Sequence, residues 1–186
     1  MRYLYSDAKM LELEEMWTQA VREARARAEQ EGRRDVIEYL QLRQANDEAR
    51  RIGIEWLFAT FLSVATEANR RGLNLIIEKT AAHKFTIGAA TMQGERVRLS
   101  LGVRALTVEA GFPRLPADGF IRGGGLVAAR IAHFGMPKAN AELLLVRANS
   151  NSTNAPVWMT IDEQNRRQQF SANDLKNHFS VFIGKV

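Results

Sequence analysis

The residues from Glu95 to Val108 alternate between apolar and polar side chains along most of their length. Such alternation is typical of a β-strand that buries one face and exposes the other. The apolar set comprises Val97, Leu99, Leu101 and Val103. The opposite set contains three arginines, Arg96, Arg98 and Arg104. The pattern therefore predicts one long strand, residues 95–108, with a buried face and a cationic face.

Further apolar stretches predict the partners of this strand. Gln93-Gly94 is a turn-forming pair, which predicts a hairpin between strands 84–91 and 95–108. Three other segments have the length and composition of strands: residues 73–77, 141–148 and 157–162. The segment 141–148 is apolar on both sides, so we expect it to be buried on both faces.

The N-terminal part of the chain has helical periodicity. In the first predicted helix one apolar stripe recurs at three- and four-residue steps, at Met10, Leu13, Trp17, Val21 and Ala24. The predicted helices cover about 8–31, 36–51 and 54–71. The third is apolar on most sides, which predicts that its large side chains lie in the core: Trp56, Phe58, Phe61, Leu62 and Val64.

A last helix is predicted near the C-terminus. Ser171 and Asp174 have the spacing of a capping pattern, and three apolar residues follow at helical steps, Leu175, Phe179 and Phe182.

Two segments leave alternatives open. Gly53 is compatible with a kink or with a true break between helices. Residues 126–134 are compatible with a strand, although Gly135 and Pro137 beyond their end favour a short helix.

Together these elements predict an α+β fold. N-terminal helices precede an antiparallel sheet of about five strands, which one or two helices cover. We expect a helical part, residues 1–72, and a basic sheet part, residues 73–186, that shares one continuous core with the helix 54–71.

Composition narrows the class of protein. The chain has no cysteine, which excludes disulfides, thiolate zinc sites and cysteine nucleophiles. No segment approaches about 18 uncharged apolar residues, so no membrane span is predicted. We therefore expect a cytoplasmic protein without membrane contact, and no motif predicts a cofactor or a metal.

Charge is distributed unevenly. Residues 1–72 hold 12 basic and 13 acidic side chains, whereas residues 73–186 hold 14 basic and 8 acidic ones. Because arginine donates paired hydrogen bonds to phosphate, a clustered surplus predicts an anionic partner. The candidate anion-binding residues are Arg96, Arg98, Arg104, Arg122, Arg130 and Arg147.

Motifs for catalysis are weak. His83, His133 and His178 lie far apart in the sequence and form no metal-binding pattern, although each could act as a general base. Gly123, Gly125 and Ala128 match a loose dinucleotide-binding pattern, but it follows a predicted antiparallel hairpin and lacks a parallel βαβ context. A turn with close backbone approach explains these glycines equally well.

The sequence therefore favours a non-enzymatic binding module whose basic sheet face contacts nucleic acid or another polyanion. One alternative is a protein-interaction or inhibitor subunit that acts through its N-terminal helices, including a homodimer formed through residues 8–31. Another is a small enzyme that acts on a phosphorylated metabolite near residues 123–125.

Overall fold

The computed structural model describes residues 16, 19–147, 155–162, 164 and 166–184. Internal contacts divide the chain into an N-terminal unit, residues 1–48, and a sheet unit, residues 49–186. In the N-terminal unit residues 19–30 are helical, and Gly32 takes a positive φ in the turn that follows. Of the predicted helix 8–31, residues 8–15 and 17–18 lie outside the described residues.

The helix α2 (Arg34–Arg70) is continuous. The prediction of two helices, 36–51 and 54–71, was wrong at their junction, because Gly53 lies inside α2 without breaking it. A side chain at Gly53 would overlap the side chain of Leu145, and the Gly53 carbonyl accepts a hydrogen bond from Trp158 Nε1 at 2.9 Å. This glycine therefore allows close packing of α2 on the sheet, which a local sequence pattern does not reveal.

The sheet unit contains seven antiparallel strands that follow one another in sheet order. They are β1 (Ile76–Ile87), β2 (Ala90–Leu101), β3 (Arg104–Phe112), β4 (Val127–His133), β5 (Ala141–Arg147), β6 (Pro156–Ile161) and β7 (Arg167–Gln169). The helix α3 (Ala172–Ile183) completes the fold. The α+β class is confirmed, with seven strands in place of about five.

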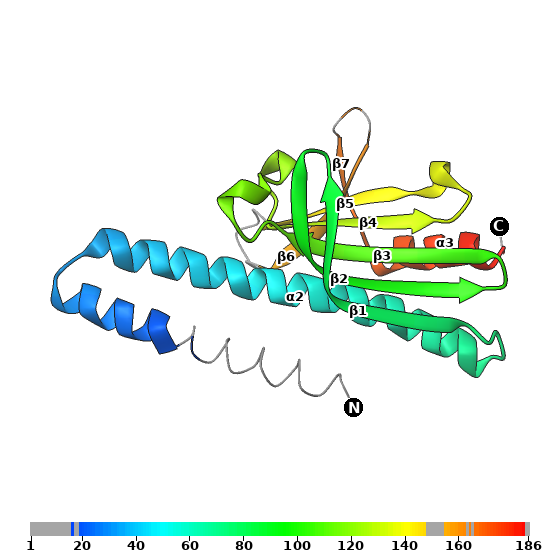
Figure 1. Cartoon of the computed structure of the whole chain (residues 1–186), viewed down its shortest axis with the longest axis horizontal. Helices are drawn as coiled ribbons and strands as arrows, with labels where there is room; N and C mark the ends of the chain where they lie inside the picture. Colours follow the sequence, from blue (N-terminus) through cyan, green and yellow to red (C-terminus); the bar gives the residue numbers. More distant parts are fainter. Residues whose placement is uncertain (1–15, 17–18, 148–154, 163, 165, 185–186) are drawn as a thin grey trace. The chain divides into compact units, whose positions relative to one another are not determined.

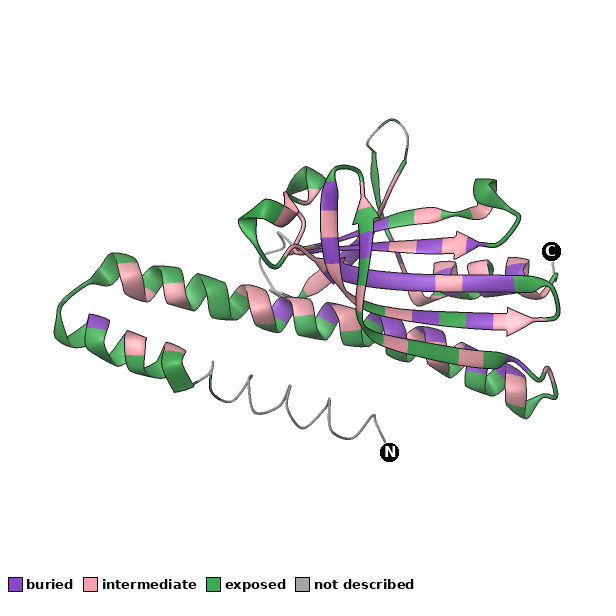
Figure 2. Ribbon diagram, in the orientation of Figure 1, coloured by how far each residue is buried: buried purple, intermediate pink, exposed green. Residues whose placement is uncertain are grey.

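Both helices cover the same face of the sheet, which we call the inner face (Figure 1). Leu57 and Phe61 of α2 and Leu175 of α3 pack in one core with the alternate apolar side chains of the strands. The strand β3 is buried along most of its length (Figure 2). Phe58 and Phe61 are buried as predicted, and Leu62 and Val64 are partly buried. Trp56 is 37% exposed, which corrects its assignment to the core.

The predicted strand 95–108 is two strands joined by a turn. Leu101 pairs with Arg104, so Gly102 and Val103 form a two-residue turn between β2 and β3. Gly102 has φ 57°, a value that such hairpin turns require at this position. Val103, predicted to be buried, is 90% exposed. Alternation alone did not reveal the turn, because the turn residue Val103 continues the alternation of apolar and polar side chains.

The turn predicted at Gln93-Gly94 lies elsewhere, at Gly88-Ala89, since Ile87 pairs with Ala90. Gly94 instead lies within β2, opposite Gly111 of β3. A side chain at Gly94 would overlap the carbonyl oxygen of Ala110, so both glycines permit a close approach of the two paired backbones.

Beyond Gly94 the end of the β1–β2 hairpin bends toward the outer face of the sheet (Figure 1). A second small apolar cluster forms there from Phe85, Ala90, Met92 and Ala128, with Ile87 and Ile121 packed against it. This cluster anchors the segment that follows β3.

The remaining expectations concern the C-terminal elements. Residues 127–133 form β4, so the preference for a helix there was wrong. Leu143, Leu144 and Leu145 are buried on both faces of β5, as predicted. The capping pattern at Ser171 is confirmed, because its hydroxyl accepts from Asp174 N and its backbone N–H donates to the Asp174 carboxylate.

Candidate functional site

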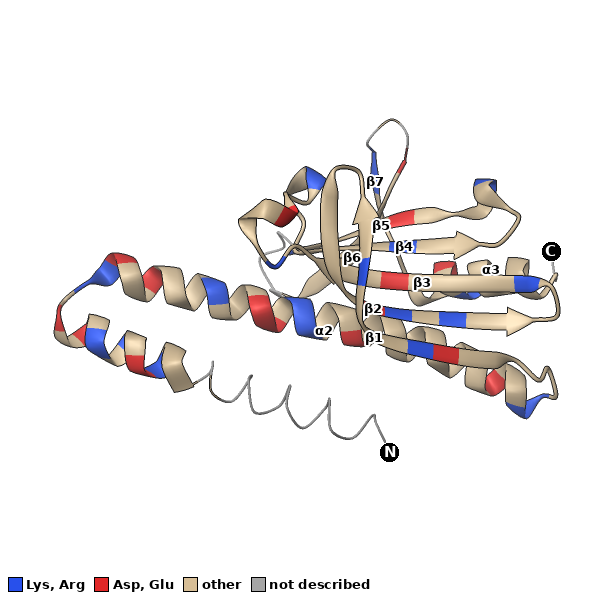
Figure 3. Cartoon of the chain, viewed as in Figure 1, with Lys and Arg blue, Asp and Glu red and all other residues tan. Residues whose placement is uncertain are grey.

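The outer face of the sheet, opposite α2 and α3, carries charges of both signs. In the register of successive strands Arg96 lies opposite Glu109, Glu109 lies opposite Arg130, and Arg130 lies opposite Glu142. In the next row Arg98 lies opposite Glu78, 4.0 Å from its carboxylate. Three arginines and three glutamates thus share this face of β1–β5, and Figure 3 shows the alternation from strand to strand. Its formal charge is balanced, contrary to the expected cationic face.

Glu109 is the buried member of this row. Its carboxylate accepts a short hydrogen bond from Arg130, and it lies 2.9 Å from His83 Nε2. The His83 ring stacks on Phe85 with a centroid distance of 5.6 Å. Because Glu109 is paired on both sides, this cluster compensates a buried charge and ties the curled end of β1 to the centre of the sheet.

The other predicted anion-binding residues are dispersed. Arg104 does not share a face with Arg96, because it pairs with Leu101, whose side chain lies on the inner face. The Arg104 guanidinium donates to the Phe182 carbonyl at the C-terminus of α3. Arg147 ends β5 opposite Pro156 and lies two residues beyond Leu145, so it falls on the inner face and not beside Arg96. The structure does not gather the six predicted arginines into one surface.

A different group of cations gathers around residues 112–126, which we call the arginine loop. Arg122 lies within it, in a 3₁₀ turn. Arg50 and Arg114 place their guanidinium groups 4.5 and 4.1 Å from the centre of the Phe112 ring. Arg50 also donates to the Leu126 carbonyl, and Arg167 of β7 donates to the Gly123 carbonyl at 2.7 Å. Four arginines therefore belong to this loop or bind it.

Hydrogen bonds inside the arginine loop hold its shape. The Asp118 carboxylate accepts from the backbone N–H groups of Arg114 and Leu115 and from the Gln93 side chain. Asp118 is the loop's single acidic residue. A loop closed in this way by its own carboxylate keeps its cations in place before any ligand arrives.

The glycine run fixes the other end of the loop. Gly123 and Gly124 have positive φ angles of 79° and 71°, and a side chain at Gly125 would overlap Leu144. The run leads into the strand β4, whereas a dinucleotide-binding loop leads into a helix. These glycines serve backbone conformation and close approach to β5.

Large apolar side chains also protrude from the arginine loop. Phe120 is 84% exposed and Leu115 is 61% exposed. The combination of exposed apolar and cationic side chains is one that ligand-binding loops use.

A second chemical feature lies between β4 and α3. His133 Nε2 is 3.0 Å from His178 Nδ1, and among the described residues His133 Nδ1 has no hydrogen-bond partner. If the proton of His133 is on Nε2, the buried Nδ1 leaves only a lone pair without a partner, and not an N–H group. We therefore infer that His133 Nε2 donates to His178 Nδ1. Burial lowers the pKa of His133 below its usual 6.5, and His178 lowers that pKa further. Burial also lowers the pKa of His178, although the Asp174 carboxylate opposes this effect.

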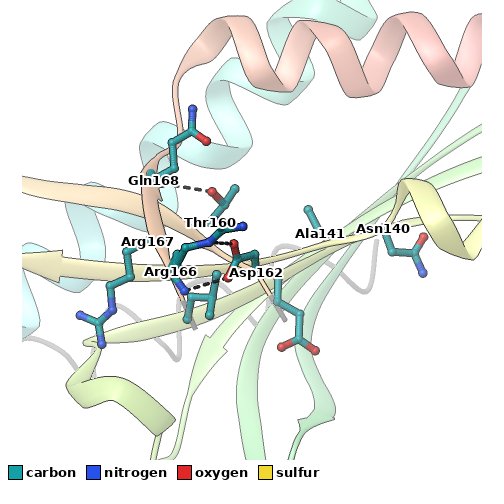
Figure 4. A pocket seen from close by; sticks show the side chains of 9 residues that line it. Asn140, Ala141, Thr160, Asp162, Arg166, Arg167 and Gln168 are labelled. Atoms are coloured by element: carbon teal, nitrogen blue, oxygen red, sulfur yellow. Dashed lines mark hydrogen bonds and ion pairs between the residues drawn. The ribbon is translucent and has the colours of Figure 1, made fainter. Parts of the chain in front are cut away.

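His178 lines a cavity of about 390 Å³, whose charged side chains are Asp174 and Lys138. It adjoins a wider open pocket of about 820 Å³ at the ends of β5, β6 and β7, where Arg166 donates to Asp162 at 2.6 Å (Figure 4). Among the residues that the structure describes, no three potential metal-binding side chains come together. Of the helices in that part of the chain, none has the length and apolar character to cross a membrane.

No family model, curated protein or solved structure matches this chain. Sequence reasoning identified Arg122 but missed Arg50, Arg114, Arg167 and Phe120. The segment R-L-P-A-D-G-F-I-R, residues 114–122, was available as a signal, since a turn-rich loop that holds both arginine and an aromatic residue is a typical binding segment.

Proposed function

We propose that the protein is a non-enzymatic binding module for nucleic acid, a polyanion, and that it binds through the arginine loop. The observation that carries this proposal is the meeting of Arg50, Arg114, Arg122 and Arg167 at one loop whose single carboxylate, Asp118, is used in hydrogen bonds within the fold. Guanidinium groups recognise phosphate through paired hydrogen bonds, and a held loop loses little entropy on binding.

The outer face of the sheet is the less favourable location for the same function. Arg130 is engaged by buried Glu109, and Arg98 lies beside Glu78. A polyanion on this face would meet three carboxylates together with three arginines, which offsets most of the attraction.

Binding to a fluorescent 20-nucleotide strand, measured by anisotropy at several salt concentrations, tests the proposal. Each phosphate contact changes the log–log salt slope by about 0.7 for a single strand. The variant Arg114→Gln/Arg122→Gln should lower affinity and flatten the slope by about 1.4. The matched control, Arg96→Gln/Arg98→Gln, removes the same charge from the outer face and should leave the slope unchanged.

Two results would contradict the proposal. Absence of binding at low salt would exclude nucleic acid as the ligand. A flattened slope in the control variant alone would place the binding site on the outer face of the sheet.

A second candidate function is protein interaction through the N-terminal unit. Tyr39 and Leu42 are 60% and 54% exposed and lie three residues apart, so they share one side of α2. We propose self-association as the form of this interaction, which light scattering would detect as a mass above the 21.0 kDa of one chain. Tyr39→Ser/Leu42→Ser should restore the monomer, and a wild-type monomer at high micromolar concentration would exclude the idea.

A further inference from the structure

We propose that the nucleic acid bound at the arginine loop is single-stranded, and that Phe120 is the surface on which one of its bases stacks. This inference rests on the proposed function and adds to it the class of ligand. It depends on a residue without charge, so it can be tested separately from the arginines.

The structure holds Phe120 outward. Ile121, the next residue, packs against the second apolar cluster beside Phe85 and Met92. On the other side Gly119 has φ 86°, and a Cβ atom added to it would lie 3.3 Å from Ala90 Cα. Both neighbours of Phe120 are therefore fixed against the protein, while its own ring remains 84% exposed. An aromatic ring anchored in this way is a stacking surface that requires no rearrangement.

The groups around Phe120 suit a single strand. Arg122 lies two residues away, and the turn through Asp118 connects the ring to Arg114. Aromatic rings stack on any base, while nearby arginines bind the phosphates or stack through their planar guanidinium groups. The same loop already contains such stacking, since Arg50 and Arg114 both lie over the ring of Phe112. Bases in a duplex are paired and stacked internally, so Phe120 would find no free base face there.

An anionic lipid surface is the other ligand that attracts arginine beside apolar residues. Within the arginine loop the strongly exposed large apolar side chains are Leu115 and Phe120, and Asp118 lies between them in sequence. Two separated side chains bury little area in a bilayer, whereas one ring is sufficient to stack a base. The observations therefore favour the nucleic acid.

The experiment compares Phe120→Ala with Phe134→Ala in the full chain. Phe134 is 71% exposed in the connection between β4 and β5, away from the arginine loop in sequence and in the sheet, so it is a matched control. Affinities are measured for a thymidine 20-mer and for a duplex of the same length. Loss of one stacked base should weaken single-strand binding by about 5- to 150-fold.

Four further results are expected together. Phe120→Ala should leave the salt slope of single-strand binding unchanged, because no charge is removed. Duplex affinity should not change in either variant, and Phe134→Ala should bind the single strand as the wild type does. Circular dichroism should show the same thermal transition for both variants, because both side chains are exposed.

Other outcomes overturn the inference. If Phe120→Ala binds the single strand normally while Arg114→Gln/Arg122→Gln does not, the proposed function stands and the stacking role fails. An equal loss for duplex and single strand would assign Phe120 to loop structure. If Phe120→Ala loses only binding to vesicles of phosphatidylserine and phosphatidylcholine, the loop binds lipid and not a base.

Discussion

His133 and His178 are joined by a 3.0 Å contact between their imidazole nitrogens, across the seam where α3 meets β4. Asp174 and Lys138, from α3 and from the connection after β4, are the charged groups that line the cavity at His178. If His178 took up a second proton, His133 would have to accept at Nε2 and carry its own proton at the buried Nδ1, where the described residues offer no partner. The geometry therefore disfavours protonation of either ring.

This pair predicts a pH-dependent stability. The folded-state pKa values of His133 and His178 are lowered below 6.5, so below that pH the unfolded chain binds more protons than the folded chain. Stability from the pair is fully present above pH 6.5 and is lost as pH falls toward the lowered pKa values. Urea unfolding from pH 8 to pH 5 should show this decline, and His133→Phe/His178→Phe should flatten it.

The lowered pKa of Asp174, caused by its hydrogen bonds with Ser171, acts in a separate range. Its contribution is present above its usual 3.8 and is lost only at lower pH. A wild-type stability that stays constant between pH 7.5 and pH 5 would contradict the prediction for the two histidines.

Phe61→Ala should destabilise the sheet unit strongly. Phe61 is 1% exposed in the core between α2 and the sheet, so its truncation leaves a cavity and costs about 3–5 kcal/mol. Phe134→Ala is the matched control, because that ring is largely in solvent and should change stability by less than about 0.5 kcal/mol. Chemical denaturation of both variants checks the prediction, and a cost for Phe61→Ala below about 1 kcal/mol would make α2 peripheral.

Gly94→Ala should cost about 3 kcal/mol or more, because the added methyl would meet the backbone of β3 and not a flexible side chain. Gly124→Ala separates this clash from conformational strain. Gly124 has φ 71° and open space around its Cβ position, so it should cost only about 1–2 kcal/mol. Equal melting temperatures for the two variants would show that the sheet relaxes readily where β2 and β3 approach each other at Gly94.

Glu109→Ala should cost about 2 kcal/mol of stability, because it removes a buried carboxylate that has two partners, His83 and Arg130. We expect less than for a fully buried ion pair, because Arg130 keeps part of its hydration. Glu78→Ala on the same face is the control: its pair with Arg98 is exposed and should contribute at most about 0.5 kcal/mol. Similar losses in urea denaturation for both variants would contradict the special position of Glu109.

Elements specified by neighbouring residues were predictable from the sequence. Ser171 and Asp174 lie three residues apart, so the capping of α3 and its buried side could be inferred locally. The strand around Leu144 was equally clear, since a short run of apolar residues is sufficient to identify it. In both cases the sequence window that carries the signal contains the interaction.

Features specified by distant residues were not predictable. In the sequence Gly94 resembles a turn residue, but a side chain is excluded there by the Ala110 carbonyl on the neighbouring strand. The prediction of a cationic face failed for the same reason, because Glu109 lies opposite Arg96 only once β3 folds back on β2. The arginine loop gathers Arg50 and Arg167 from positions far apart in the chain, and no single-sequence pattern records that meeting.

The strict sequence order of the seven strands has a consequence for how the chain is made. Each strand pairs with the one before it, so the sheet can grow hairpin by hairpin on the ribosome without closing a long loop. The apolar side chains of α3 follow all seven strands in the sequence, and until they emerge part of the inner face lacks its cover. The helix α3, which is made after all seven strands, thus protects the nascent sheet from association with other chains.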